Sequence, residues 1–308
     1  MIKHTHTEPT ELNFSKLKER IMQVNDPCLG KYNDIREMLY DLTIDNKPTL
    51  IMATGGSKVI AYYLQLIIER LGLTGIICEV IEPRDYFYKA NRDMFSNLIA
   101  ISASGNTNGI SEALLDFRGN KYLITENKKE SNYQVVSWSN ELYDREKSFI
   151  SLATSLGPIS LLLDSTTSLN LELGSNEIKR INDKIKELLS RSKEKINKLN
   201  VDFKDTSLIQ IMSGYETKTS ASVLESNLTE VGLAPAVIHD KGSYCHGRSN
   251  LLFQYPNSKL IYLSHGLKEL DSLLIESINS EYSNISVFDT NDLSDNIFWK
   301  EYYLILQM

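Results

Sequence analysis

The chain has few cysteines and no long apolar run. Its 308 residues include three cysteines, Cys28, Cys78 and Cys245, with no CxxC pair. An odd set without close pairs suits neither a disulfide framework nor a zinc site, so we expect a reducing, cytoplasmic setting and no metal. No stretch approaches the ~20 apolar residues that cross a bilayer, and the N-terminus lacks the apolar core of a signal peptide. We therefore expect a soluble protein with no membrane partner.

The chain also lacks an excess of positive charge. Lys and Arg number 33 against 40 Asp and Glu, which gives a net charge of -7. This balance gives no excess of positive charge that would attract nucleic acid or anionic membranes. Neither the GxxxxGK[ST] spacing of a nucleotide P-loop nor a GxGxxG fingerprint occurs, which argues against ATP and NAD, and no cofactor is expected. A small-molecule ligand is the remaining expectation.

What the chain does contain is two rounds of strands alternating with helices. The first round predicts strands at 49–53, 76–81, 97–101 and 121–124, with helices at 31–43, 58–71, 109–117 and 147–163. The second predicts strands at 208–212, 259–263 and 284–288, with helices at 218–231, 267–279 and from 295. Such alternation is typical of a parallel sheet covered on both faces.

The two rounds are separated by a charged amphipathic segment. Between 176 and 199, apolar residues recur at helical spacing among many Lys and Glu, which predicts a long connecting helix. We therefore predict an α/β fold of two doubly wound parallel-sheet domains, flavodoxin-like or Rossmann-like. The predicted parts are a first domain with N-terminal helices at 1–170, a helical connector at 171–200 and a second domain at 201–308.

Two turns of glycine and hydroxyl residues follow strands of the first domain. Thr54-Gly55-Gly56-Ser57 follows strand 49–53, and Ser102-Ala103-Ser104-Gly105-Asn106-Thr107 follows strand 97–101. Ligands of doubly wound sheets bind outside the carboxyl ends of strands, where NH and OH groups can converge on an anion. One such turn is usually a helix cap, a role that Ser57 also suits, but two in one sheet favour phosphate binding. The predicted phosphate-binding residues are Gly55, Gly56, Ser57, Ser102, Ala103, Ser104, Gly105 and Thr107.

These segments resemble the sugar isomerase (SIS) domain family, whose motif is SxSGxT and whose ligands are phosphosugars. The second half adds Glu230-Val231-Gly232-Leu233-Ala234-Pro235 through Gly242-Ser243-Tyr244-Cys245-His246-Gly247. That stretch is similar, without a gap, to the Glu-to-His-Gly segment in the isomerase half of glucosamine-6-phosphate synthase. The resemblance covers roughly residues 45–308 and implies a tandem pair of SIS domains.

The resemblance also implies residue roles. The matching hydroxyls hold the sugar phosphate, and the glutamate matching Glu230 moves a proton between C1 and C2 of the open-chain sugar. The histidine matching His246 helps to open the ring, often from a neighbouring subunit, which implies a homodimer or larger homo-oligomer. Proton transfer suits a partly buried carboxylate, and ring opening suits a group that titrates near neutrality. We therefore expect a sugar-phosphate isomerase, or a related deglycase or deaminase, with Glu230 at a domain edge.

Three departures from the family pattern keep a second function open. Asn227 stands where the synthase has a lysine, and the chain ends at Met308 without the family's lysine-bearing tail. Arg248 stands where proline usually follows the His-Gly pair, and it could contact an anionic substrate or pair with a surface carboxylate. A non-catalytic phosphosugar sensor is therefore the alternative. The loops 82–91 and 242–250 are expected to shape the pocket.

Overall fold

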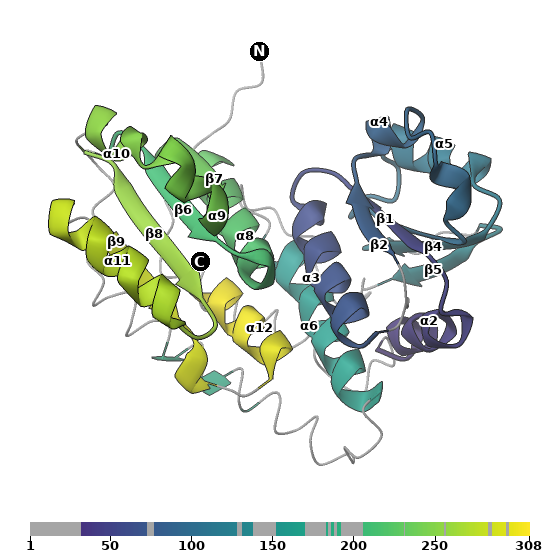
Figure 1. Cartoon of the computed structure of the whole chain (residues 1–308). Helices are drawn as coiled ribbons and strands as arrows, with labels where there is room; N and C mark the ends of the chain where they lie inside the picture. Colours follow the sequence, from purple (N-terminus) through teal and green to yellow (C-terminus); the bar gives the residue numbers. More distant parts are fainter. Residues whose placement is uncertain are drawn as a thin grey trace. The chain divides into compact units, whose positions relative to one another are not determined.

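The computed structural model describes most of two compact units, Met1–Lys186 and Glu187–Met308 (Figure 1). The described residues are 32–72, 77–127, 131–137, 152–169, 183, 186, 187, 190, 191, 206–230, 232–255, 257–282, 285–293 and 296–308. Apart from the five isolated residues, the expected connector at 171–200 lies outside this set. The domain boundaries therefore stay predictions.

The first unit contains a parallel sheet with strand order β2-β1-β3-β4-β5. Its strands are β1 Thr49–Ala53, β2 Cys78–Ile81, β3 Asn97–Ile101, β4 Asn120–Thr125 and β5 Gln134–Ser137. Every residue of β1 and β3 is buried, as expected for continuous apolar runs covered on both faces. These two strands are neighbours, with Thr49 paired to Asn97 and Ala53 to Ile101.

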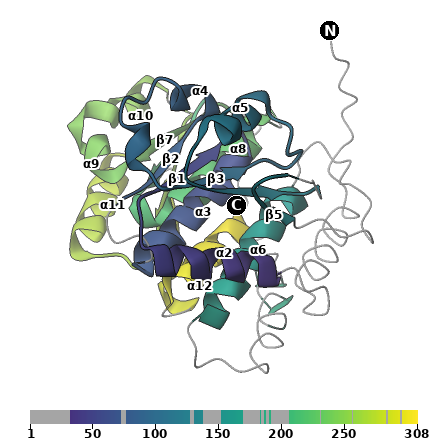
Figure 2. The same cartoon turned by 90° about the vertical axis from the view of Figure 1, so that its right-hand side faces the viewer.

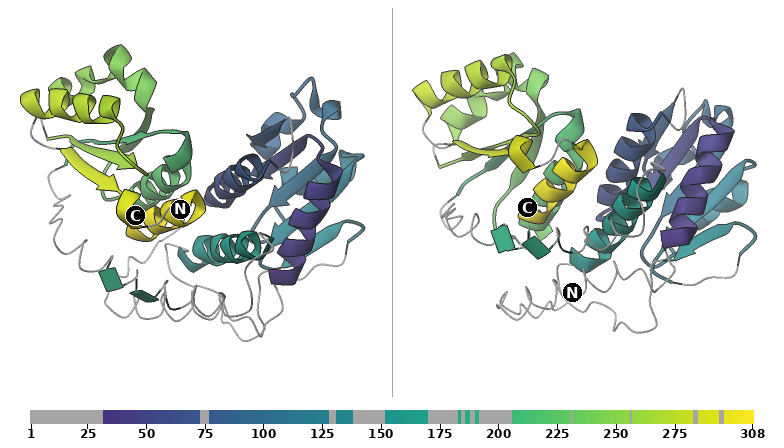
Figure 3. Two further views of the ribbon diagram at one scale, coloured as in Figure 1. Left: turned by 60° about the horizontal axis from the view of Figure 1, so that its bottom comes forward. Right: turned by 90° about the horizontal axis from the view of Figure 1, so that it is seen from below.

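Helices cover the two faces of this sheet in two groups. On one side, α2 packs on α6 and α6 on α3, which in turn lies against β1 and β2 (Figure 2, Figure 3). On the other side, α4 and α5 share a core cluster with alternate residues of β1, β3 and β4. These helices are α2 Tyr32–Asp45, α3 Ser57–Arg70, α4 Pro83–Tyr86, α5 Asn108–Asp116 and α6 Leu152–Leu169, with a 3₁₀ turn at Arg92–Met94. The chain therefore leaves β1 toward one face and β3 toward the other.

The second unit repeats this plan with the order β7-β6-β8-β9, again all parallel. Its strands are β6 Ile209–Ser213, β7 Ala236–Asp240, β8 Lys259–Ser264 and β9 Ile285–Asp289. Helices α8 Lys218–Glu230 and α12 Ile297–Gln307 lie toward one face, and α9 Lys241–Ser243, α10 Asn250–Gln254 and α11 Glu269–Glu281 toward the other. Short helical turns lie at Tyr215–Thr217, Tyr244–Arg248 and Asn291–Leu293.

The predicted α/β fold with parallel sheets is confirmed, although several short elements were missed. Strands β5 and β7 were not predicted because each is only half buried and the second ends in His239-Asp240. Segment 242–250, expected as a loop, consists largely of helical turns because the buried Tyr244 anchors it. No helix in the described ranges is both long and apolar enough to span a membrane.

Candidate functional site at the carboxyl ends of β1 and β3

The two hydroxyl-rich turns flank one position in the first sheet. Strand β1 ends in the turn before α3, and its neighbour β3 ends in the turn before α5. Because α3 and α5 lie on opposite faces, the crossovers diverge here. Such a switch point is where open α/β sheets form a ligand crevice. The sequence-predicted phosphate turns are therefore placed where this topology binds ligands.

The turn after β3 brings three hydroxyl groups together. Oγ of Ser102 lies 3.0 Å from Oγ1 of Thr107 and 3.5 Å from Oγ of Ser104. The backbone NH of Gly105 donates to the same Ser102 oxygen at 3.1 Å, and the NH of Asn106 donates to Ser104 Oγ at 3.2 Å. Ser102 is buried, whereas Ser104 and Thr107 are half-buried. The cluster thus has an internal anchor and two partly accessible hydroxyls.

The end of β4 supports this turn, a role that the sequence analysis missed. Thr125 Oγ1 donates to the carbonyl of Ala103 at 3.1 Å, and Asn127 Nδ2 donates to the carbonyl of Ser104 at 3.0 Å. Gly105 has a φ of +68°, and a Cβ there would lie 3.0 Å from Thr125 Oγ1. Glycine is therefore required both by backbone conformation and by the neighbouring side chain. Polar residues directly after a predicted strand were the available signal.

The start of α5 adds a favourable field for an anion. Thr107 is the N-cap residue, but its side chain makes no cap hydrogen bond, and its hydroxyl faces Ser102 instead. The first turn of α5 contains no acidic side chain. The partial positive charge of a helix N-terminus favours a phosphate at such a position.

The turn after β1 is open. Gly55 has a φ of +55°, and neither Gly55 nor Gly56 has an atom within 4 Å of a Cβ placed on it. The expectation that Ser57 caps α3 is wrong, because Gly56 is the N-cap and Ser57 is the first helical residue. The hydroxyl of Ser57 is therefore not used as a cap. Both glycines are exposed, which leaves the backbone approachable by a ligand.

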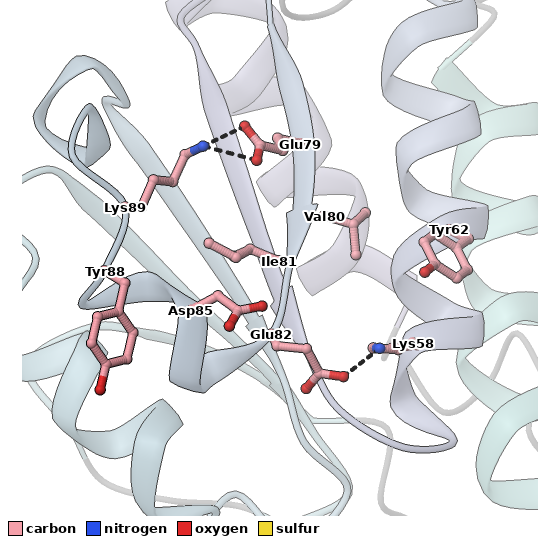
Figure 4. A pocket seen from close by; sticks show the side chains of 9 residues that line it. All are labelled: Lys58, Tyr62, Glu79, Val80, Ile81, Glu82, Asp85, Tyr88 and Lys89. Atoms are coloured by element: carbon pink, nitrogen blue, oxygen red, sulfur yellow. Dashed lines mark hydrogen bonds and ion pairs between the residues drawn. The ribbon is translucent and has the colours of Figure 1, made fainter.

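A hollow lined by several charged side chains lies beside this turn, along the edge strand β2 (Figure 4). It contains two ion pairs: Lys58 contacts Glu82, and Lys89 Nζ lies 2.8 Å from both carboxylate oxygens of Glu79. Lys58 directly follows Ser57, so the hollow adjoins the turn after β1. Glu82, at the start of the loop expected to shape the pocket, lines the hollow. The other lining residues are Tyr62, Val80, Ile81, Asp85 and Tyr88.

The second unit presents Glu230 and His246 on its surface. Glu230 is the exposed last residue of α8, and Ser226 Oγ donates to its Oε1 at 2.7 Å. His246 is exposed within the helical turn Tyr244–Arg248, at a kink where Gly247 has a φ of +94°. Asp240 fixes the start of this segment by accepting from the NH groups of Gly242 and Ser243. The described contacts do not include one between Glu230 and His246.

Arg248 contacts a buried imidazole. Its Nη1 lies 3.5 Å from Nδ1 of His239, a residue that is 1% exposed. Burial, together with the Arg248 charge, lowers the pKa of His239 below 6.5. His239 is therefore neutral at pH 7. Within the described residues Arg248 has no carboxylate partner at salt-bridge distance, which leaves its charge available for an anion.

The switch point of the second sheet, between β6 and β8, is filled by the chain's own side chains. His265 follows β8, and its Nε2 lies 2.8 Å from Oε2 of Glu301 on α12. The other oxygen of Glu301 accepts from the NH of Ser220 in the first turn of α8, at 2.7 Å. The carboxylate of Glu301 thus lies at the N-terminus of α8. A glutamate in the middle of a largely apolar and aromatic helix was a sequence signal that went unused.

The described residues contain no group of three or more His, Cys, Asp or Glu side chains that could hold a metal ion. His239 and His246, which lie close in sequence to Asp240 and Cys245, differ in environment, since His239 is buried and His246 is exposed.

Sequence comparison gives no match to any protein-family model or to any curated protein. Solved structures do show the same fold. A candidate sugar-binding protein from Salmonella typhimurium aligns with a TM-score of 0.69 at 13% identity, over 96% of this chain and 98% of its own. The C-terminal domain of glucosamine-fructose-6-phosphate aminotransferase from Francisella tularensis gives 0.66 at 14% identity, over 99% and 95%. Tagatose-6-phosphate ketose/aldose isomerase from Escherichia coli gives 0.66 at 14%, over 98% and 95%. At these identities the comparisons show a shared fold, and that fold is the one found in phosphosugar isomerases.

Proposed function

We propose that the chain consists of a tandem pair of SIS-type domains and that it binds a sugar phosphate at the β1–β3 switch point of the first domain. The observation that carries this is the hydroxyl cluster of Ser102, Ser104 and Thr107 at the start of α5. Hydroxyls and a helix N-terminus together match the acceptor oxygens and negative charge of a phosphate monoester. Gly55, Gly56 and Ser57 form the opposite side of the site.

We further propose that the bound sugar undergoes proton transfer between C1 and C2, as in aldose-ketose isomerisation or a related deglycation or deamination. In this proposal His246 assists ring opening from a neighbouring subunit, and Glu230 transfers the proton. The support is the Glu-to-His-Gly resemblance and the fold shared with isomerases and with a glucosamine-6-phosphate deaminase from Thermotoga maritima. Arg248 is a candidate contact for an anionic substrate group. The active form is proposed to be a cytoplasmic homo-oligomer.

Phosphosugar binding is tested first by thermal stabilisation. Hexose and amino-sugar phosphates are compared with the same sugars without phosphate. A ligand at 100 times its Kd stabilises the folded state by about 2.7 kcal/mol, a visible shift in Tm. The proposal expects stabilisation only by phosphorylated sugars, and its loss in Ser102→Ala/Ser104→Ala. Equal shifts with and without phosphate would contradict the phosphate site.

Turnover is tested by exchange of the C1 or C2 proton with solvent deuterium. Wild-type protein should catalyse exchange on a stabilising phosphosugar, and Glu230→Gln should abolish it without loss of binding. Exchange that survives in Glu230→Gln would remove Glu230 from the mechanism.

A non-enzymatic sensor is the second candidate. It is favoured by the exposure of Glu230 and by Asn227, which stands where the related synthase has a lysine. Stabilisation by phosphosugars without proton exchange, product formation or amine release would support the sensor.

A further inference from the structure

The two phosphate turns, each taken with the residue that follows it, contain a single cationic side chain. Residues 54–58 and 102–108 read TGGSK and SASGNTN, so Lys58 is the one positively charged residue in either segment. It is the second residue of α3, directly after Ser57, and the first turn of that helix has no acidic residue. A phosphate held by hydroxyls and NH groups alone would keep most of its charge uncompensated, and a lysine next to the site would neutralise part of it.

Lys58 is held by an internal carboxylate. Its Nζ forms an ion pair with Glu82, which directly follows β2, and the two side chains are 33% and 35% exposed (Figure 4). The hydrogen bond that Lys58 donates to Glu82 raises the pKa of the ammonium, so Lys58 stays charged at neutral pH. Glu82 therefore pairs with the ammonium group of Lys58 in the way that a phosphate oxygen would in a complex.

The strand order places the strand that leads to Lys58 between the strands that lead to Glu82 and to Ser102. Strand β1, which leads to Lys58, lies between β2, which leads to Glu82, and β3, which leads to Ser102. Neighbouring strands are about 4.8 Å apart. A lysine has a flexible four-carbon stem, so the same side chain can point toward the end of either neighbour.

On the basis of the proposed phosphate site, we propose that Lys58 is an additional phosphate ligand that exchanges Glu82 for the phosphate of the incoming sugar. Glu82 then sets the affinity of the site, because it competes for the same ammonium group. The exchange forms and breaks no covalent bond, since one ion pair replaces another. It makes binding selective for a dianionic phosphate over a neutral sugar hydroxyl.

The hollow offers a matched control. Lys89 and Glu79 form a second ion pair in the same hollow, but Lys89 adjoins neither turn in the sequence, whereas Lys58 directly follows one. Variants of this pair change the local charge by the same amount without removing the proposed ligand.

The test titrates inorganic phosphate at constant ionic strength into the full chain and six single variants, one of which is Ser102→Ala. Lys58→Met should weaken phosphate binding by about tenfold or more, as expected for loss of a charged hydrogen bond, and Lys58→Arg should restore part of it. Glu82→Gln should strengthen binding by about threefold or more, because it removes the competing carboxylate. Lys89→Met and Glu79→Gln should stay within about twofold of wild type, since solvent screens their more distant charge.

The outcomes separate this inference from the proposed function. If Lys58→Met and Glu82→Gln bind phosphate like wild type while Ser102→Ala does not, the role of Lys58 is overturned and the phosphate site stands. If the wild type binds neither phosphate nor any phosphosugar, the proposed site itself is wrong. If Lys58→Met does not fold, Glu82→Gln decides, because unchanged or weaker binding in that variant contradicts competition.

Discussion

His265 and Glu301 form a buried pair at the switch point of the second sheet, with Nε2 and Oε2 2.8 Å apart. Their side chains are 2% and 0% exposed. Glu301 also accepts from the NH of Ser220, and His265 Nδ1 lies 2.7 Å from Oγ1 of Thr290. The position that holds hydroxyls and an open turn in the first sheet therefore holds an internal hydrogen-bonded network in the second sheet.

The buried pair predicts a large stability effect. Glu301→Ala removes the acceptor of the Ser220 NH and one of two oxygens near His265 Nε2, the other being the carbonyl of Glu216. A buried polar group left without its partner costs about 1–3 kcal/mol, so we expect a loss of about 2 kcal/mol or more. Glu301→Gln keeps an oxygen for the Ser220 NH and should cost less. Urea unfolding of the three proteins measures the differences. A loss below about 1 kcal/mol for Glu301→Ala would show that the network does not hold the second unit together.

Gly105 predicts a second stability effect. An alanine there must adopt a φ of +68° and place its Cβ 3.0 Å from Thr125 Oγ1. Strain in the left-handed region costs about 1–2 kcal/mol, and displacement of Thr125 adds to it. Gly56→Ala is the control, because Gly56 has a helical φ of -57° and open space around it, so its cost should stay below about 1 kcal/mol. Thermal unfolding distinguishes them, and equal losses would contradict the argument.

The sequence predicted the parts of the fold that depend on apolar runs. Strands β1 and β3 were predicted with their observed bounds, because in each a polar first residue is followed by four apolar residues that end at a turn signal, as is typical of a central parallel strand. Strand β7 was missed because three of its five residues are only half-buried and it ends in two polar residues, His239 and Asp240. Edge pairing depends on tertiary neighbours that are distant in sequence.

The sequence predicted which residue types form the candidate site, but not which side chains of neighbouring strand ends lie against it. The SxSGxT string identified Ser102, Ser104 and Thr107, whose hydroxyls meet in the structure. Thr125 and Glu82 contribute through strand ends far along the chain, and only the order β2-β1-β3-β4 places them beside the two turns. The functional pairing of Glu230 with His246 stays a prediction.

Buried His239 predicts a pH dependence of stability. Its pKa is lowered in the folded state, so below about pH 6.5 the unfolded chain binds more protons than the folded chain. Stability should therefore fall as the pH decreases from about 6.5 toward the lowered pKa, with a slope of at most about 1.4 kcal/mol per pH unit from this group. His239→Phe should reduce that slope, and Arg248→Met should reduce it less because burial is the larger cause. Unfolding curves between pH 5 and 8 measure it, and an unchanged slope in His239→Phe would exclude this residue.

Ser102 and Thr107 should act as one unit in ligand binding, because their hydroxyl oxygens are 3.0 Å apart. The backbone NH of Gly105, which lies between them in the sequence, donates to the Ser102 hydroxyl. Ser102→Ala removes the anchor that orients the Thr107 hydroxyl, and Thr107→Val removes that hydroxyl directly. Each single variant should weaken phosphosugar binding by about tenfold, in line with a lost hydrogen bond to a charged group. The double variant should lose less than the sum, because contacting residues couple by about 0.5–3 kcal/mol. Titration calorimetry with one stabilising phosphosugar measures the affinity of the wild type, the two single variants and the double variant. Ser280→Ala on α11 is the control, because the Ser280 hydroxyl donates to the carbonyl of Ser277 within its own helix. Strictly additive losses would show that the two hydroxyls bind the phosphate independently.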